Sequence, residues 1–228
     1  MQSVSIVKSI EPLNTFNSRV VRGMFDISED SITETFNCEI DIDFDWNIGI
    51  IVGNSGTGKS TIAKDIFKSE YFIDQKYSNE PIIDSITKSR SVQETIKILS
   101  LVGFASPKSW LKPYHILSNG EKMRVDVARA ILSDGDIIVF DEFTSVVDRT
   151  VAQISSLSIQ KSIRKDKRKF VAISCHYDII EYLQPDWILD TTSMRFSRPD
   201  KKKLQNSNCQ YMKQEISQRG TFLRNITI

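Results

Sequence analysis

The spacing of apolar residues changes several times along the chain, and each change marks a predicted element. Alternation over 19–27 and over 35–44 predicts two strands of an antiparallel N-terminal ribbon, joined by a polar turn at 28–31. The apolar run 46–52 predicts a buried strand, and 61–68 predicts a helix because Ile62, Ile66 and Phe67 fall on one face. The stretch 69–91 is polar and contains Pro81, so we expect loops and short helices there.

From residue 91 onward, helical spacing and strand spacing alternate. Helices are predicted over 91–102, 117–132 and 150–164, and strands over 136–140, 170–174 and 187–189. This order predicts an α/β fold with a mostly parallel central sheet. We expect one domain over 1–192, with a reduced helical subdomain at roughly 70–116, and a basic C-terminal extension over 193–228.

Length and composition are those of a single globular domain. The chain has 228 residues, of which 40% are hydrophobic. It contains no run of about 20 apolar residues, and its first residues lack the apolar core of a signal peptide, so we expect a cytoplasmic protein without membrane insertion. Cys38, Cys175 and Cys209 are widely spaced, which favours free thiols over a disulfide framework or a zinc site.

Net charge does not indicate a partner, because the formal net charge is +1. Two basic runs stand out: 161–169 carries six basic residues in nine, and 201–203 consists of three lysines. The first run ends a predicted helix, where basic side chains complement the helix dipole and remain solvated. Two interpretations stay open, a solvated helix end and a surface that contacts phosphates.

The segment 53–61 reads GNSGTGKST, the pattern of a phosphate-binding P-loop (Walker A), between a predicted strand and a predicted helix. Backbone N–H groups wrap the phosphates in such a loop, and glycines leave room for that approach. Lys59 is expected to reach the β- and γ-phosphates, and Ser60 to bind Mg²⁺. The nucleotide-binding residues predicted in this loop are Gly53, Asn54, Ser55, Gly56, Thr57, Gly58, Lys59, Ser60 and Thr61.

Further polar groups follow in a fixed order. The segment 117–121 reads LSNGE and precedes a predicted helix, so Ser118 and Glu121 alone would be explained by a capping box. Asp141 and Glu142 then end the predicted strand 136–140, and 145–148 reads SVVD. His176 comes just after the predicted strand 170–174. The order of these groups carries more information than any of them taken singly.

Together with the P-loop, these segments resemble the ATP-binding cassette (ABC) ATPases over about residues 46–176. The signature of that family is usually written LSGGQ, so Asn119 stands here in place of a glycine and Glu121 in place of glutamine. Asparagine tolerates turn geometry, while Ser118 and Gly120 keep the hydroxyl and the open backbone N–H. The resemblance implies an α/β P-loop NTPase fold of the ABC type.

The resemblance also implies a role for each residue. Asp141 would support Mg²⁺ together with Ser60, and Glu142 would be the general base that orients the attacking water. His176 would contact the γ-phosphate, and Lys59 would complete the catalytic set. The bound nucleotide is expected to be ATP, since no guanine-reading NKxD-type motif is evident in the sequence.

The family arrangement further implies a homodimer that forms on ATP binding. Its signature residues complete the site of a second subunit in a head-to-tail dimer, so the set expected around each ATP also includes Ser118, Asn119, Gly120 and Glu121. Asp148 would lie at the same interface, in the position of the D-loop of that family. A homodimer is the simplest assembly for a single type of chain.

Two family elements have no obvious counterpart. The glutamine of the loop between the P-loop and the signature would be Gln75 or Gln93, or Asp84 in its place. The aromatic residue that stacks on adenine would be Phe25, with Phe16 as a weaker alternative. A strand aromatic is more often part of the core, so these assignments compete with a structural role.

The interval between Lys59 and Leu117 is short for a transporter subunit of this family, and far too short for the coiled coil of the SMC-type ATPases. The chain therefore looks like a compact soluble bacterial or phage member of the family, an ATP hydrolase that moves a nucleic acid or protein partner in DNA transactions or phage–host conflict. Two alternatives stay open: the ATP-binding subunit of a membrane transporter, and an ATP-gated interaction module with little turnover.

Overall fold

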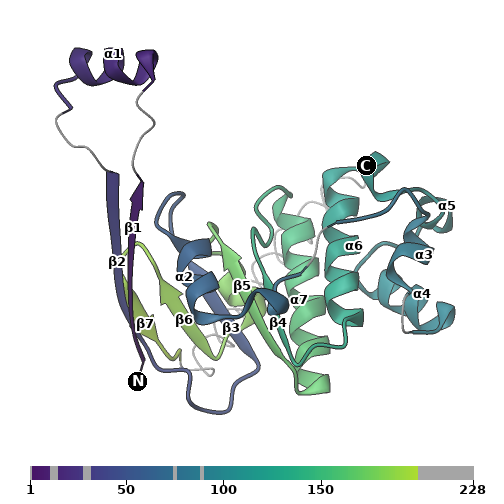
Figure 1. Ribbon diagram of the computed structural model, residues 1–228. Helices are drawn as coiled ribbons and strands as arrows, with labels where there is room; N and C mark the ends of the chain where they lie inside the picture. Colours follow the sequence, from purple (N-terminus) through teal and green to yellow (C-terminus); the bar gives the residue numbers. More distant parts are fainter. Residues whose placement is uncertain (1, 11–14, 28–31, 74–75, 88–89, 200–228) are drawn as a thin grey trace, which may run out of the picture.

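The computed structural model describes residues 2–10, 15–27, 32–73, 76–87 and 90–199. Figure 1 shows a sheet with helices on both faces and a long ribbon that projects from one side. The sheet has the strand order β4-β5-β3-β6-β7. Its strands are β3 (Ile48–Val52), β4 (Ile137–Phe140), β5 (Lys169–Ser174), β6 (Trp187–Asp190) and β7 (Arg195–Ser197). All neighbours pair in parallel except β7, which confirms the predicted α/β fold with a mostly parallel sheet.

The central strands read as continuous apolar runs because both faces of the sheet are covered. All five residues of β3 are buried. On one face, Ile50 packs with residues of α6 (Asn119–Leu132) and α7 (Arg149–Asp166). On the other face, Ile51 packs with Ile62 of α2 (Lys59–Ile66). Because successive strand residues point to opposite sides, α2 and α6 lie on opposite faces of the sheet.

Close packing between β3 and β6 depends on one glycine. A Cβ built on Gly49 would lie 2.0 Å from the ring of Trp187. That ring in turn meets Trp46 edge to face at 5.4 Å and stacks near Phe67 at 6.4 Å between centroids. The Trp187 ring therefore occupies the space that a side chain at position 49 would need.

Short helices fill the range expected for the reduced helical subdomain. They are η1 (Ser69–Tyr71), α3 (Ile82–Ile86), α4 (Val92–Leu101), α5 (Pro107–Trp110) and η2 (Tyr114–Ile116), and a further short helix, α8 (Ile179–Leu183), follows β5. The helix expected over 91–102 is α4, capped by Ser91, whose hydroxyl accepts from the N–H of Glu94. In Figure 1, α3, α4 and α5 lie beside α6, at the end of the molecule opposite the ribbon.

The antiparallel ribbon is present, but its strands are not the ones expected. It consists of β1 (Gln2–Ile10) and β2 (Ile32–Ile40), paired with Ile6 opposite Phe36. The expected strand 19–27 was wrong, because α1 (Phe16–Met24) occupies most of this range. Thr15 caps that helix by accepting from the N–H of Ser18. The expected turn at 28–31 lies outside the described residues.

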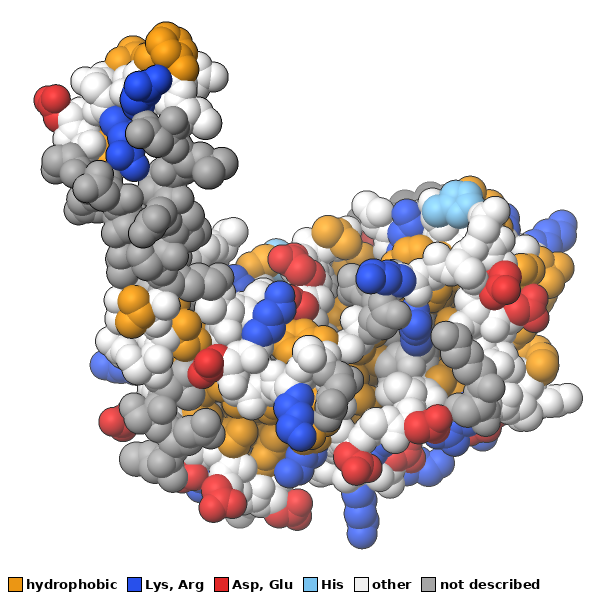
Figure 2. Space-filling model, viewed as in Figure 1, with side chains coloured by type: hydrophobic (Ala, Val, Ile, Leu, Met, Phe, Trp, Pro, Cys, Tyr) orange, Lys and Arg blue, Asp and Glu red, His pale blue; other side chains and the backbone are white. Residues whose placement is uncertain are grey.

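Helix α1 is carried at the tip of the ribbon (Figure 1). None of its side chains is buried, and its apolar side chains stand in solvent together with arginines, as the upper end of the molecule in Figure 2 shows. Phe16, Val20 and Met24 are four residues apart, which places them on one side of the helix. The nearly alternating pattern over 19–27 therefore belongs to an exposed amphipathic helix.

At the other end of the described chain, β7 extends the sheet past residue 192. The expected boundary between domain and extension therefore falls inside the sheet, one hairpin too early. Residues 200–228 of the expected basic extension lie outside the described residues. Among the helices that the structure describes, none has the length and apolarity to cross a bilayer.

Candidate functional site

The backbone leaves β3 and enters the P-loop along a path open only to glycine. Gly53 has φ +156°, and a Cβ there would lie 2.2 Å from Oγ1 of Thr191. Gly58 has φ +80°, and a Cβ there would lie 2.4 Å from the ring of Phe36. The neighbouring side chains and the positive φ angles both exclude other residues at these two positions.

Lys59, the first residue of α2, folds back over this loop. Its Nζ donates to the carbonyl oxygens of Gly53 at 2.9 Å and Asn54 at 2.7 Å. The hydroxyl of Thr57 donates to the same Asn54 carbonyl at 2.9 Å. A cation is thus held above a loop whose N–H groups lead into a helix N-terminus, an arrangement suited to a polyphosphate. Asn54, Ser55 and Gly56 are exposed at the loop surface, and Thr61 is half-buried in α2.

The next residue of α2 meets the end of β4. Ser60 Oγ donates to Oδ1 of Asp141 at 2.9 Å, although the two residues are 81 positions apart in sequence. The N–H of Glu142 donates to the same carboxylate oxygen at 2.9 Å. A serine hydroxyl and a carboxylate are the oxygen ligands that Mg²⁺ prefers in phosphate-binding sites. Both residues therefore fit the magnesium site expected from the sequence.

The turn after β4 is strained. Glu142 has φ 57° and Thr144 has φ 63°, values that residues other than glycine rarely adopt. The N–H of Phe143 donates to the carbonyl of Ile173 at 2.9 Å, which holds the turn against β5. Strain of this kind is typical of functional sites, where surrounding contacts impose it.

Four of the sequence-predicted residues line one small pocket beside this turn. Its volume is about 80 Å³, and its wall consists of Ser55, Lys59, Asp141, Glu142, Ser145, Ile173, Ser174 and Cys175. A lysine from the P-loop thus shares a pocket with two carboxylates from the end of another strand. The pocket has the combination of charges that phosphate and metal binding require.

His176 follows β5, one residue past the pocket wall. Its backbone N–H donates to Oγ of Ser174 at 3.1 Å, and the residue is half-buried. Nearby, Arg149 at the start of α7 donates to both carboxylate oxygens of Asp178 at 2.9 Å. This ion pair ties the segment after His176 to the start of α7.

Sequence reasoning missed a set of polar residues behind the P-loop. After β6, Thr192 accepts from the N–H of Asn54 at 3.0 Å, and Thr191 Oγ1 lies 2.6 Å from Oγ1 of Thr57. Asp190 accepts from the N–H of Thr192 at 2.9 Å and from the Tyr177 hydroxyl at 3.0 Å. The strand order places β6 next to β3, which is why these strand-end residues reach the loop. Their only sequence signal is a polar group just after a predicted strand.

The LSNGE segment forms the start of α6. The hydroxyl of Ser118 accepts from the N–H of Glu121 at 3.3 Å, and the Glu121 carboxylate accepts from the N–H of Ser118 at 3.0 Å. The backbone N–H of Ser118 is the main reason that the pKa of Glu121 is lowered. The capping box is therefore present. It leaves Ser118 and Asn119 exposed and Gly120 half-buried at the helix end.

Asp148 occupies the corresponding position at the start of α7. Its carboxylate accepts from the N–H of Val151 at 3.0 Å, and the residue is exposed. Val146, two residues earlier, is 67% exposed although it is apolar. The SVVD segment thus presents a polar cap and an apolar side chain to solvent.

None of the residues 118–121, all of them described, lines the pocket around Lys59. This follows from the fold, because α2 and α6 pack on opposite faces of the sheet. The two helix starts that the sequence assigns to one nucleotide are thus separated by the sheet within a single chain.

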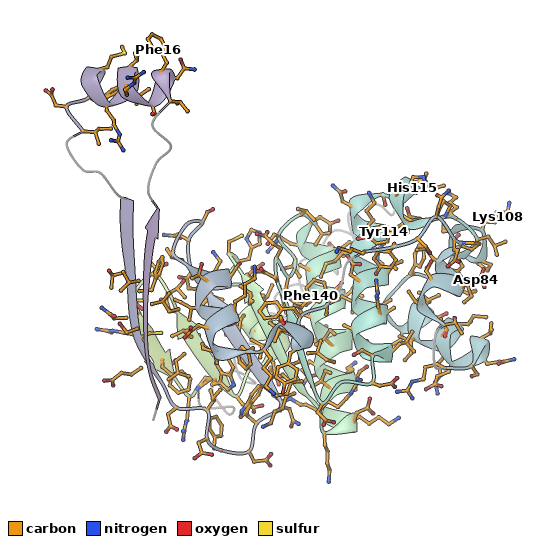
Figure 3. The ribbon with its side chains drawn as sticks, viewed as in Figure 1. Phe16, Asp84, Lys108, Tyr114, His115 and Phe140 are labelled. Carbon is orange, nitrogen blue, oxygen red and sulfur yellow. The ribbon has the colours of Figure 1, made fainter. Side chains whose placement is uncertain are left out.

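The candidate adenine-stacking residues lie elsewhere. Phe25 follows α1 at the tip of the ribbon and is 71% exposed, and Phe16 lies at the other end of the same helix (Figure 3). Figure 1 shows this helix well away from α2. The aromatic ring that does contact the P-loop is Phe36 of β2, beside Gly58. Sequence reasoning missed Phe36 because it sought the aromatic residue at Phe25 or Phe16 and not in the second expected strand, 35–44.

The candidates for the glutamine loop lie in different parts of the molecule. Phe72 forms an isolated parallel bridge to Val139, so the segment 72–73 lies beside β4, which ends just before Asp141. Gln75 comes two residues later and lies outside the described residues. Gln93 is exposed on α4, and Asp84 is exposed on α3, at the far end of the helical part in Figure 3.

Comparisons with known proteins agree with this geometry, although no family model matches the chain. A dipeptide transport ATP-binding protein, DppD of Bacillus subtilis, is 33% identical over 92 residues, which cover 40% of this chain and 27% of DppD. An energy-coupling factor transporter ATP-binding protein, EcfA1 of Mycoplasmopsis pulmonis, is 26% identical over 176 residues, 61% of this chain and 66% of EcfA1. The chain thus spans less than two thirds of both proteins.

Solved structures share the fold. The dimeric structure of MJ0796, a bacterial ABC transporter cassette, matches with a TM-score of 0.55 at 16% identity, over 72% of this chain and 89% of that chain. A dimeric post-hydrolysis state of the same cassette, bound to ADP and Pi, matches with a TM-score of 0.56 at 16% identity, over 75% and 93% of the two chains. At this identity, the matches establish the arrangement of strands and helices.

Proposed function

We propose that this chain, a member of the ATP-binding cassette (ABC) ATPase family, binds Mg-ATP between two copies of itself, arranged head to tail, and hydrolyses it. One observation carries the proposal: the P-loop helix α2 and the signature helix α6 lie on opposite faces of the sheet. A signature that cannot close over the P-loop of its own chain is free to close over that of a second copy. Two copies related by a twofold axis would complete two such sites.

Each site would divide its work among residues from both copies. Lys59 and the P-loop backbone of one copy hold the phosphates, and Ser118 with Gly120 of the other copy closes the site. Ser60 and Asp141 would hold Mg²⁺, which neutralises phosphate charge when bound. Glu142 orients the attacking water and accepts its proton, and His176 contacts the γ-phosphate. Most of the catalysis is then positioning and charge stabilisation.

We propose nucleic acid as the partner on which this motion acts. A hollow of about 660 Å³ between α4 and α7 is lined by four basic and two acidic side chains, together with apolar ones; the charged residues are Arg90, Lys97, Lys161, Lys165, Glu94 and Asp166. Two arginines of the basic run 161–169 are used inside the fold instead: Arg164 lies 3.4 Å from Asp186, and Arg168 donates to the carbonyl of Ser133. Lys169 lies over the ring of Trp46, with Nζ 5.0 Å from its centre. The lysines of the run that line the hollow are Lys161 and Lys165, and these two are the ones proposed to contact phosphates.

A second candidate function is that of an ATP-binding subunit of a membrane transporter. The printed names of DppD and EcfA1 support it, because both are transporter ATP-binding proteins. It predicts that a tagged chain is recovered from the membrane fraction with an integral membrane protein in fixed ratio. ATP-dependent dimers that form in the absence of any membrane component support the first function.

Light scattering on Glu142→Gln protein, with and without Mg-ATP, tests the dimer. The expected mass rises from the 26.1 kDa of one chain to that of two chains on adding Mg-ATP. Adding Ser118→Arg to this variant should prevent the change while leaving binding of a fluorescent ATP analogue intact. Ser100→Arg, on the exposed side of α4, is the matched control and should dimerise normally.

The outcomes of these experiments distinguish the shared ATP site, an ATP-gated interaction module and nucleic-acid binding. Unchanged dimerisation in the Ser118→Arg variant contradicts the shared site. Dimers of the parent chain without measurable turnover favour an ATP-gated interaction module. The nucleic-acid proposal is tested with a fluorescently labelled 20-nucleotide single strand and its duplex. Fluorescence anisotropy measures how much of each DNA is bound by the protein with and without Mg-ATP. DNA held only by the ATP dimer supports it, and DNA ignored by both forms contradicts it.

A further inference from the structure

A buried carboxylate on α6 joins two tyrosines that come from different parts of the chain. The hydroxyl of Tyr77 donates to Oδ1 of Asp126 at 2.7 Å, and that of Tyr114 donates to Oδ2 at 2.8 Å. The two rings stack in parallel, with centroids 3.9 Å apart and planes 6° from each other. Asp126 is only 5% exposed, so its oxygens depend on these two hydroxyls.

The same face of α6 makes further contacts to both tyrosines. Arg129, three residues after Asp126, donates from Nη1 to the carbonyl of Lys76 at 2.9 Å, and its guanidinium lies 4.7 Å from the centre of the Tyr77 ring. Lys122, four residues before Asp126, has Nζ 5.7 Å from the centre of the Tyr114 ring. Residues three and four apart line one helix face, so a single stripe of α6 holds both aromatic rings.

The two tyrosines lead to the two halves of the proposed ATP site. Four residues before Tyr77, the N–H of Ile73 donates to the carbonyl of Val139 at 3.0 Å, in the strand that ends just before Asp141. Tyr114 stands four residues before Ser118, beside α6 (Figure 3). The cluster thus connects β4, which leads directly into the proposed metal ligand Asp141 and general base Glu142, with the helix end that bears the signature.

We propose that Asp126, with Tyr77 and Tyr114, is a positioning cluster that fixes the Ser118 end of α6 relative to β4, so that the signature meets the ATP held by a second copy. This inference rests on the proposed function. Asp126 does not line the pocket around Lys59, so its role is carried by the helix to which it belongs.

The chemistry of the cluster supports positioning over simple stabilisation. Burial raises the pKa of Asp126 to about 6, which means that the ionised carboxylate is disfavoured where it stands. Apolar residues of similar volume often replace such a buried polar group without loss of stability. The carboxylate orients the two tyrosines. Because it accepts hydrogen bonds from both hydroxyls at once, it fixes the angle of both rings relative to α6.

The test compares dimerisation with folding in the Glu142→Gln background. Asp126→Asn should raise the dissociation constant of the Mg-ATP dimer about tenfold, the effect of one lost charge-assisted hydrogen bond. Affinity of the monomer for a fluorescent ATP analogue, which reports on the P-loop of the same chain, should stay within about twofold. Light scattering over a range of protein concentrations measures the first quantity, and equilibrium titration the second.

Val127→Ala is the matched control, since Val127 is fully buried on the same helix and its truncation lowers stability without touching the cluster. If Val127→Ala weakens the dimer as much as Asp126→Asn does, or if Asp126→Asn dimerises like its parent, the positioning role is overturned. Should Asp126→Asn fail to fold, the triple replacement Tyr77→Phe, Tyr114→Phe and Asp126→Leu gives an apolar cluster, and it should show the same weakened dimer. A parent that never dimerises with Mg-ATP removes the proposed function itself, and the inference with it.

Discussion

The hydroxyl of Ser60 donates to the carboxylate of Asp141 at 2.9 Å, and this bond joins the first turn of α2 to the end of β4. The two residues approach because β5 alone separates β4 from β3 in the sheet, and the carboxyl ends of parallel strands meet at one edge. The two oxygen atoms that we propose as Mg²⁺ ligands are thereby already held together, which would reduce the entropy lost on binding the metal.

Replacement of Ser60 by alanine should therefore weaken binding of Mg-ATP, by about tenfold, because one metal ligand is lost. In excess EDTA the variant and the parent should bind ATP alike, since the phosphate contacts of the loop remain. Ser69→Ala, in η1, is the control and should not change either affinity. Equal weakening with and without Mg²⁺ would show that Ser60 acts on the phosphates rather than on the metal. Fluorescence titration with an ATP analogue measures both constants.

Glu142→Gln should lower the rate of ATP hydrolysis by about 10²–10⁴-fold, the usual contribution of a general base, while ATP still binds. The side chain keeps its size, and the strained backbone at φ 57° is retained. Glu39→Gln, on the exposed side of β2, should hydrolyse ATP at the parent rate. A phosphate-release assay measures the hydrolysis rate. If Glu142→Gln hydrolyses ATP as fast as the parent, the general base is another residue.

Gly49→Ala should destabilise the fold strongly, by about 2–3 kcal/mol or more, because the added methyl group would overlap the ring of Trp187. Gly23→Ala is the matched substitution in α1, where nothing lies within 4 Å of the added Cβ. It should leave stability unchanged or raise it by up to about 1 kcal/mol, since alanine favours the helix. Urea denaturation of the two variants gives both values, and a tolerated Gly49→Ala would mean that β3 and β6 repack.

Asp126 should make stability depend on pH below neutrality. Its pKa is raised to about 6 by burial, although hydrogen bonds from Tyr77 and Tyr114 and the charges of Arg129 and Lys122 act in the opposite direction. A carboxyl whose pKa is higher in the folded state contributes stability that is present below about pH 4 and is lost as pH rises to about 6. Between pH 7 and pH 5, the parent should therefore gain stability relative to Asp126→Asn, by about 1–2 kcal/mol.

Urea denaturation of both proteins at pH 5 and pH 7 gives their free energies of unfolding. The quantity to compare is the stability difference between parent and variant at each pH. Comparing the two proteins at each pH cancels the other titrating groups, which are the same in both. A constant difference between them across the two pH values would show that Asp126 keeps an ordinary pKa.

The sequence predicted the mostly parallel sheet correctly for a physical reason. Buried parallel strands such as β3 and β5 are short apolar runs, and the P-loop glycines are fixed by local geometry at Gly53 and Gly58. The apolar runs and the positive φ angles of the two glycines are both properties of short segments of the chain.

The contacts that it missed depend on which strands become neighbours. Thr191 and Thr192 reach the P-loop only because β6 pairs with β3, and Phe36 reaches Gly58 only through the register of the ribbon. The helix at 16–24 was missed because an exposed amphipathic segment of nine residues has the same composition as an edge strand, and Thr15 at its start was the deciding signal.

Because the ribbon is long, a small rotation at its base produces a large displacement of α1 at its tip. Its base lies against α2 and β7, next to the P-loop, and its strands of nine residues span about 30 Å. A rotation of about 10° at that base would displace α1 by roughly 5 Å, about one turn of a helix. If the two copies close over ATP, α1 at the tip of the ribbon would move by about one helical turn. A shift of that size is enough to change which residues of α1 contact a bound partner.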